Sequence, residues 1–190
     1  PLPRPPPPRP AAAARPRAHR RAPEVPARPF LPYTDPRLHR PAAPVEAVTE
    51  SVRMIWDDMI DTMEAMPGVG LAAPQIGIML RLAVVDASSR RGEAVRMANP
   101  EVLHESVQLR AHEEASPNLP GVSARIERPR AVTVRFLNDQ GEVEDRDFVG
   151  LWATSVQHQI DHLNGRLYVD HLSPLRRKML VARSAKLRRG

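Results

Sequence analysis

The spacing of apolar residues changes twice along residues 30–190, and this order limits the fold class more than any other feature. Apolar residues first recur at helical spacing, from Val45 to Met66, and later alternate with polar ones in short stretches. We expect helices at residues 46–65, 150–164 and from Ser173 onward, and strands at residues 78–86, 131–137 and 143–149, the last two joined by a turn. A helix, then strands, then two helices describes an α+β domain.

Chain length and composition exclude several classes of protein. At 190 residues the chain is long enough for one domain with a buried core, and hardly for two. It has no cysteine, so it forms no disulfide and offers no thiolate to a metal ion. No stretch approaches the roughly 18 consecutive apolar residues of a membrane-spanning helix. The first residues also lack the apolar block of a secretory signal, so we expect no membrane partner and a cytoplasmic location.

The net charge of +6 comes from the two ends of the chain. Residues 1–29 hold seven arginines and one acid, and residues 173–190 hold seven basic residues and no acid. Residues 30–172 hold 14 arginines and 21 acids, a net charge of −7. Basic arms favour nucleic acid through its phosphates, so we expect no sequence-specific recognition.

Residues 1–29 differ in composition from the rest of the chain. They contain eleven prolines and only two bulky apolar residues, Leu2 and Val25. Such a segment cannot bury enough surface to offset its ordering entropy, so we expect a disordered arm. Its many arginines are also typical of an organelle transit segment, which would make the location organellar, although the prolines oppose the amphipathic helix of such segments. The folded domain is expected at residues 30–190.

Two histidines stand four residues apart in the helix expected at residues 150–164. His158 and His162 therefore project from one face, and both imidazoles can bind the same metal ion. In hydrolases with an H-E-x-x-H helix, the glutamate after the first histidine is the general base. Gln159 stands there, and its amide cannot accept a proton at neutral pH. Taken alone, two histidines at this spacing are more typical of an ordinary helix surface than of a metal site.

Three short segments, in a fixed order, resemble the signature motifs of the peptide deformylase family. They are residues 68–75 (Gly-Val-Gly-Leu-Ala-Ala-Pro-Gln), 114–121 (Glu-Ala-Ser-Pro-Asn-Leu-Pro-Gly) and 157–165 (Gln-His-Gln-Ile-Asp-His-Leu-Asn-Gly). The first matches G-x-G-L-A-A-P-Q throughout, and the third matches Q-H-E-x-D-H-L-x-G except at Gln159. The second matches E-G-C-L-S-x-P-G only at Glu114, Pro120 and Gly121. The resemblance covers residues 30–185 and implies antiparallel sheets around a central metal-site helix, with helices near both ends.

The resemblance implies a site for one divalent metal ion, Fe²⁺ or Zn²⁺. In the family the ion, usually iron(II), is held by two histidines and the cysteine of the second motif. His158 and His162 match the histidines, whereas Ser116 occupies the cysteine position. A neutral hydroxyl is a far poorer ligand than a thiolate, so we expect a weak or absent metal site. Three nearby side chains are alternative third ligands: His112, Glu113 and Glu114.

The resemblance also implies which residues act on the substrate, the N-terminal formyl-Met end of a nascent peptide. Gln75 matches the glutamine that donates a hydrogen bond to the oxyanion, and Gly70 and Leu71 match the edge along which the peptide lies. In the family the base is the glutamate after the first histidine, and the second oxyanion donor is the backbone N–H after the cysteine. Gln159 and Pro117 occupy these positions, and proline has no N–H.

These substitutions predict an impaired or inactive enzyme. Losing one oxyanion donor typically costs about 100- to 1000-fold in rate, and losing a general base roughly 100- to 10,000-fold. We therefore interpret the chain as a deformylase-like protein with a formed cleft and little or no activity. One alternative is a working metallohydrolase that uses Asp161 or Glu114, although a structural salt bridge is the competing interpretation of Asp161. The others are a module that binds N-terminal methionine without turnover and a ribosome-binding accessory.

Two surfaces are expected to contact ligands or partners. By the same alignment the wall of a methionine pocket comes from four residues: Val69, Leu151, Thr154 and Ser155. The two hydroxyls either make this pocket more polar or bond back to their helix. In the basic helix at residues 173–190, Leu175, Met179 and Ala182 share one face and are expected to pack on the body. The cations then face outward, either toward the ribosome, which the family's C-terminal helix contacts, or simply to complement the acidic body.

Overall fold

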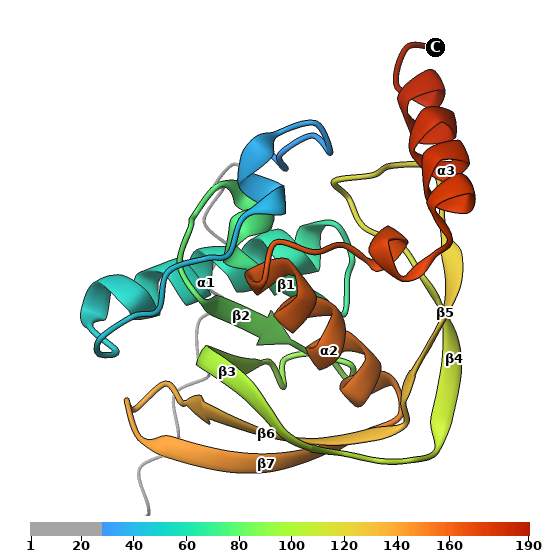
Figure 1. The fold of residues 1–190 in the computed structure, drawn as a ribbon. Helices are drawn as coiled ribbons and strands as arrows, with labels where there is room; N and C mark the ends of the chain where they lie inside the picture. Colours follow the sequence, from blue (N-terminus) through green and yellow to red (C-terminus); the bar gives the residue numbers. More distant parts are fainter. Residues whose placement is uncertain (1–27) are drawn as a thin grey trace, which may run out of the picture.

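The computed structural model describes residues 28–190, so the arm expected at residues 1–29 lies almost wholly outside the described residues. The described helices are α1 (Glu50–Ala65), α2 (Leu151–Leu163) and α3 (Pro174–Leu187), with the short 3-10 helices η1 (Pro36–His39), η2 (Ala73–Ile76) and η3 (Tyr168–His171) (Figure 1). The strands are β1 (Gly70–Ala72), β2 (Leu82–Val85), β3 (Val95–Glu105), β4 (Leu109–Glu114), β5 (Ala124–Pro129), β6 (Ala131–Leu137) and β7 (Val143–Val149). The expected α+β class is confirmed.

A five-stranded antiparallel sheet forms the main layer, with strand order β1-β2-β3-β6-β7. Strands β4 and β5 pair separately as a two-stranded antiparallel sheet. Strand β1 lies at the edge of the large sheet and pairs with β2 on one side only. Helix α2 contacts both sheets and lies at the centre of the molecule in Figure 1. This is the arrangement that the resemblance implies.

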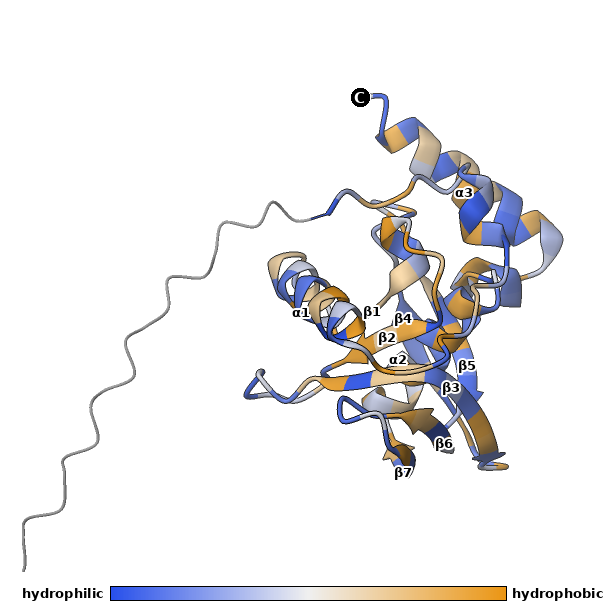
Figure 2. Cartoon of the chain, turned by 90° about the vertical axis from the view of Figure 1, so that its left-hand side faces the viewer, coloured by the Kyte–Doolittle hydropathy of each residue, from blue (hydrophilic) through white to orange (hydrophobic). Residues whose placement is uncertain are grey.

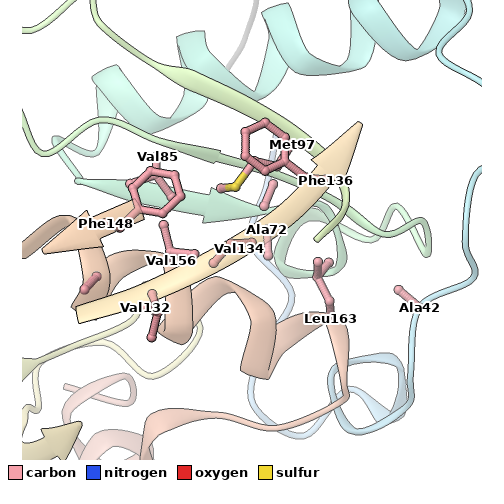
Figure 3. Close-up of a cluster of buried hydrophobic side chains, with 12 residues drawn as sticks. Ala42, Ala72, Val85, Met97, Val132, Val134, Phe136, Phe148, Val156 and Leu163 are labelled. Carbon is pink, nitrogen blue, oxygen red and sulfur yellow. The ribbon is translucent and has the colours of Figure 1, made fainter. Parts of the chain in front are cut away.

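Strand β2 is buried on both faces, because α1 covers one face of the sheet and α2 covers the other. Leu82 and Val84 pack in the cluster that α1 completes. Ala83 and Val85 belong to the cluster on the opposite face, between the sheet and α2. Figure 3 labels Val85 in this cluster. Figure 2 shows this strand as hydrophobic. Strand β2 is shorter than the strand expected at residues 78–86. Its apolar residues do not alternate with polar ones, because neither face of the strand meets water.

Capping residues set where the helices begin. The Thr49 hydroxyl accepts a hydrogen bond from a backbone N–H of the first turn at 3.3 Å, so α1 begins at Glu50 rather than at residue 46 as expected. The Ser173 hydroxyl accepts a similar bond at 3.3 Å, and Pro174 occupies the first turn, which confirms the expected start of α3.

The expected hairpin before α2 and the expected glycine after α2 are also present. Strands β6 and β7 form the predicted hairpin, in register from Ala131 opposite Val149 to Leu137 opposite Val143. Helix α2 ends at Leu163, one residue before the expected end. Gly165 follows with a φ of 74°, and a Cβ there would lie 2.7 Å from the backbone of the η1 segment. Only glycine fits that position, which fixes how the chain leaves the site helix.

Helix α3 packs on the body through a different face from the one expected. Leu180 and Val181 are partly buried against the cluster that η3 and β5 form, and the buried Ser184 hydroxyl donates to the Pro120 carbonyl at 2.7 Å. The side chains that were expected to dock are instead exposed: Leu175, Met179 and Ala182. The helix carries apolar side chains on two faces, and the face that packs on the body is the one that contains Ser184. Within residues 28–190, no helix has the length and apolar character needed to cross a bilayer.

Candidate active site

The three motif segments, far apart in the sequence, meet around one cavity of about 460 Å³. Its lining comes from the segment before β1, from the β4–β5 loop and from one face of α2. Five of the predicted site residues line this cavity: Gly70, Gln75, Ser116, His158 and Gln159. The other two, Leu71 and His162, are buried behind it. The Leu71 side chain packs in the α1 cluster, so only its backbone on β1 can face a ligand.

The two histidines lie together on α2, with ring centroids 5.0 Å apart. The His158 Nδ1 atom is 2.8 Å from a carboxylate oxygen of Glu114. Because Glu114 is ionised, this contact places the ring proton on Nδ1 and leaves the lone pair on Nε2. A carboxylate behind a histidine in this way is the usual support for an imidazole that binds a metal ion. The arrangement does not fit an ordinary surface pair, because both rings are buried.

His162 is 1% exposed, and neither ring nitrogen has a hydrogen-bond partner within residues 28–190. Burial, followed by the neighbouring His158, lowers the pKa of His162 well below its ordinary value. The ring is therefore neutral and keeps one lone pair. A buried polar atom without a partner is costly, and such atoms are typical of groups that bind a ligand or an ion.

A buried ionic network lies behind the histidines. Arg128 of β5 donates to both Glu114 oxygens, at 2.7 and 2.9 Å, and to Asp161 at 2.9 Å. His171 is 2.7 Å from the same Asp161 oxygen. Burial alone would raise the pKa of both carboxyl groups, but hydrogen bonds from His158 and Arg128 to Glu114, and from His171 and Arg128 to Asp161, hold each pKa below its ordinary value. Both are carboxylates at neutral pH.

The ionic network shows what Asp161 and Glu114, the two alternative catalytic residues, contact in the structure. Asp161 and Glu114 are both engaged by Arg128 in ion pairs, so the structure places Asp161 in the salt bridge that was the competing interpretation. The other alternative ligands are engaged elsewhere: His112 bonds Thr154 at 2.7 Å, and Glu113 accepts from Ser123 at 2.6 Å. Residues 28–190 contain no group of three or more histidine, aspartate or glutamate side chains placed to hold a metal ion.

Gln159 lies beside His158 and is 4% exposed. Its Oε1 has no hydrogen-bond partner within the described residues, and its Nε2 lies against Gly70. A Cβ on Gly70 would overlap both that nitrogen and the Ser155 hydroxyl, so glycine is needed for the edge strand to approach α2. The position that a general base would occupy therefore holds a neutral amide with a free acceptor.

Ser116 and Gln75 are joined by a third buried side chain, Asn118. The Gln75 Nε2 atom donates to Asn118 Oδ1 at 2.9 Å and to the Ser116 Oγ at 3.3 Å. The Ser116 hydroxyl in turn donates to Asn118 Oδ1 at 3.0 Å. Asn118 also donates through Nδ2 to the carbonyls of Leu31, at 2.8 Å, and Gln75, at 3.0 Å. Both amide protons of Gln75 are thus engaged within the protein.

The donors at the site fit a divalent metal ion only in part. His158 and His162 offer two imidazole nitrogens, and the second histidine has no other partner within residues 28–190. Ser116 and Gln159 offer neutral oxygens, and the Ser116 hydroxyl is already tied to Asn118. Two imidazoles with neutral oxygens bind a divalent ion, but with fewer strong donors than a site that includes a thiolate.

The predicted wall of a methionine pocket is present, and its two hydroxyls are hydrogen-bonded to other parts of the protein. All four predicted wall residues line the cavity: Val69, Leu151, Thr154 and Ser155. The Thr154 hydroxyl bonds His112 at 2.7 Å, and the Ser155 hydroxyl donates to the Val69 carbonyl at 3.0 Å. Neither bonds back to its helix. Because both hydroxyls are satisfied in this way, the pocket loses much of the polarity that their side chains suggest.

Two residues of the site were missed by sequence reasoning. Asn118 stands at the serine position of the second motif, so the motif alignment already contained the signal that would have identified it. Arg128 had no such signal. It lies on β5, outside the three motifs and opposite Arg110 in the strand register, and its side chain meets Glu114 only in the folded structure.

Comparison with known proteins agrees with the geometry. The family model described as "Polypeptide deformylase" matches residues 27–178. Peptide deformylase 1 of Burkholderia multivorans is 42% identical over 161 residues, which cover 85% of this chain and 89% of that protein. The peptide deformylase of Caulobacter vibrioides is 44% identical over 156 residues, covering 80% and 90%.

Solved structures of similar proteins have the same fold. A crystal structure of a peptide deformylase from Legionella pneumophila superposes with a TM-score of 0.80 at 41% identity, covering 85% of this chain and 95% of that one. A structure from Acinetobacter baumannii, described as a Met-ala-ser bound class I type b peptide deformylase, gives a TM-score of 0.71 at 35% identity, covering 76% and 97%.

Proposed function

This chain belongs to the polypeptide deformylase family, and on that premise we propose that its cleft binds the N-terminal methionine end of a peptide but removes a formyl group slowly or not at all. The observation that carries the proposal is Gln159. Its neutral amide stands beside His158, where the family's motif has glutamate, and an amide cannot accept a proton at neutral pH. The substitutions at Ser116 and Pro117 act in the same direction.

Peptide binding rests on the formed cleft. The cavity of about 460 Å³ opens beside β1, whose free edge can pair with an extended peptide. Val69 and Leu151 line the apolar part of the wall, and burying a methionine side chain there is favourable by about 25 cal/mol per Å² of apolar area. The related A. baumannii deformylase described as Met-ala-ser bound supports the same ligand class for this chain.

A divalent ion, Fe²⁺ or Zn²⁺, is the cofactor that this family implies. His158 and His162 would hold it here, and a bound ion would supply positive charge that polarises a carbonyl oxygen. Glu114 orients the His158 ring through the 2.8 Å contact at Nδ1. With Ser116 in the cysteine position, we propose that the ion is held weakly.

A restoration experiment tests the proposal. Hydrolysis of formyl-Met-Ala-Ser is measured for the wild-type protein, for Gln159→Glu, and for the triple variant Ser116→Cys, Pro117→Leu and Gln159→Glu, each with added Fe²⁺ or Zn²⁺. The wild type should be slower than the triple variant by at least about a thousandfold, given the typical costs of losing a base and an oxyanion donor. Gln140→Glu, in the exposed turn after β6, is the matched control and should change nothing. Wild-type turnover equal to that of the triple variant would disprove impaired catalysis.

We further propose that α3 binds the ribosome through its outward face. The observation that favours this function is the exposure of Leu175, Met179 and the cations around them, Arg176, Lys178 and Arg183. The body of the chain carries a net charge of −7 and would be repelled by RNA, so the cationic helix is the part suited to contact phosphates.

A further inference from the structure

The backbone of residues 68–70 forms one wall of the cavity and leads into the free edge of β1. Two neighbouring elements hold the carbonyl of Val69. It accepts from the Asp86 N–H, just after β2, at 2.9 Å and from the Ser155 hydroxyl of α2 at 3.0 Å. The Gly68 carbonyl, one residue earlier, is held by a side chain that lies outside the three motif segments. The position of this wall therefore depends on a residue that the motifs do not include.

That side chain is Arg91, and its guanidinium bonds three parts of the chain at once. Nη2 donates to the Gly68 carbonyl at 2.6 Å and to Glu64, near the end of α1, at 2.9 Å. Nη1 donates to the Asp86 carbonyl at 2.7 Å, and Nε donates to the second Glu64 oxygen at 3.2 Å. Hydrogen bonds from an ionised donor are roughly twice as strong as neutral ones, and arginine offers a planar fork of several donors. Arg91 therefore ties the cavity wall to α1 and to the end of β2.

The backbone at Arg91 has an uncommon conformation. Its φ is 59°, in the left-handed region that residues other than glycine seldom adopt, and Gly92 follows with a φ of 78°. The Asp86 carboxylate holds this loop by accepting from the Ser88 N–H at 3.0 Å and from the Glu93 N–H at 2.9 Å. Such a conformation persists only where surrounding contacts determine it, and it is frequent at ligand sites. A surface ion pair alone would not require it.

We propose that Arg91 is a positioning residue for the peptide ligand: it holds the Gly68 carbonyl and so fixes the wall and the strand edge on which the N-terminal methionine end lies. This inference rests on the proposed function, because it concerns the same cleft. Arg91 acts through Gly68, which lines the cavity. An edge that is already fixed need not be ordered when the peptide binds, so fixing it raises affinity.

The test measures the affinity of Met-Ala-Ser for the full chain by isothermal titration calorimetry with a chelator present. We expect Arg91→Met to weaken binding at least about tenfold, since a charge-assisted bond and the fixed edge are lost together. Arg96→Met is the matched control. Arg96 also pairs with an acid of α1, Asp57, at 3.1 Å, and its side chain is 32% exposed against 31% for Arg91. Its loss should change the affinity less than about twofold.

Two further variants separate positioning from overall stability. Arg91→Lys keeps a charge beside Glu64 but has no fork to reach Gly68 and Asp86 together, so it should weaken Met-Ala-Ser at least about fivefold. Glu64→Gln removes the ion pair and leaves the bond from Arg91 to Gly68, so the affinity should stay within about twofold of wild type. Thermal melting checks the fold of each variant, and Zn²⁺ titration without the chelator checks the histidine pair. If Arg91→Met does not fold, Arg91→Lys decides.

The outcomes separate this inference from the proposed function. Wild-type affinity in a folded Arg91→Met or in Arg91→Lys would overturn the inference and leave peptide binding intact. Equal losses in Arg91→Met and Arg96→Met would also overturn it, as would affinities that simply follow the melting temperature across the four variants. Absence of Met-Ala-Ser binding by the wild type would overturn the proposed function and the inference together.

Discussion

Arg128 Nε and Glu114 Oε2 lie 2.7 Å apart, and both side chains are only 4% exposed. The pair connects β5 to the end of β4, and through Glu114 it fixes the ring of His158. Glu114 lines the cavity and Arg128 holds it from behind, so the orientation of His158 depends on both. The candidate active site is therefore built on a buried ionic network.

Removing one partner of this pair should strongly destabilise the fold. Arg128→Met leaves two buried carboxylates without their counterion, and we expect a loss of roughly 3–5 kcal/mol in the free energy of unfolding. Arg135→Met is the matched control: its 2.8 Å ion pair with Asp145 is exposed on both sides, so its loss should cost much less stability. Urea denaturation measures both. Similar losses for the two variants would show that the buried network contributes no more than a surface pair.

Ser116→Cys should raise metal affinity by adding a thiolate to the two imidazoles. Zn²⁺ binding, followed by competition with a chromophoric chelator, should show at least about a hundredfold gain, because thiolates are far stronger ligands for this ion than hydroxyls. Ser51→Cys places a thiol on the exposed side of α1 and is the control. An unchanged affinity in Ser116→Cys would mean that residue 116 does not face the metal position.

Gly70→Ala should disturb the contact between β1 and α2. The added Cβ meets the Gln159 nitrogen and the Ser155 hydroxyl, and such overpacking costs about 1–3 kcal/mol. Adding Gln159→Ala should recover most of that loss, since it removes one of the overlapping side chains. Gly68→Ala is the control, because its Cβ would meet only the flexible Met66 side chain. Thermal unfolding of the three variants and the wild type decides the point, and a harmless Gly70→Ala would refute the proposed contact.

Stability should fall as the pH drops below about 6.5, even before the carboxylates titrate. His162 has a depressed pKa in the folded protein and its ordinary value of 6.5 in the unfolded chain. Below pH 6.5 the unfolded state therefore binds one more proton, and the free energy of unfolding falls by up to about 1.4 kcal/mol per pH unit. The metal-free protein is the material to use. His162→Gln should flatten the profile below pH 6.5, and an unchanged slope in this variant would contradict the prediction.

The outward face of α3 is expected to matter for ribosome binding and not for the fold. Arg176→Glu with Arg183→Glu should abolish co-sedimentation with ribosomes, and wild-type binding should decrease steeply with salt because phosphate contacts release counterions. Arg40→Glu with Arg125→Glu reverses two exposed charges on the body and is the control. A chain starting at Phe30 should bind like the full chain. Binding that follows residues 1–29 instead would disprove the role of α3.

Measurements of unfolding free energy can show which of the two apolar faces of α3 packs on the body. Leu175→Gln and Met179→Gln, at 68% and 63% exposure, should change the free energy of unfolding by less than about 0.5 kcal/mol. Leu180→Gln, on the docked face, should cost more than about 1 kcal/mol. Chemical denaturation of the three variants is sufficient. A larger loss for Leu175→Gln and Met179→Gln than for Leu180→Gln would support the docking face that periodicity predicted.

The sequence alone determined the parts of this protein that depend on local chemistry. The hairpin of β6 and β7, the caps of α2 and α3, and the spacing of His158 and His162 follow from turn residues and helical periodicity. The ordered motifs identified the family, and the identity of Gln159 and Pro117 was enough to predict lost catalytic groups, because an amide cannot act as a base and a proline has no N–H.

Only the tertiary structure decided what depends on contacts between distant segments. The period of β2 could not be read from its residues, because burial on both faces removes the alternation. The prediction of which face of α3 docks on the body was wrong for a similar reason. Two faces of the helix carry apolar residues, and the face that docks is the one whose Ser184 donates to the Pro120 carbonyl. Arg128 acts on the site through contacts that no local pattern encodes. The motif alignment gives the position of Asn118, but its side-chain partners also come from packing.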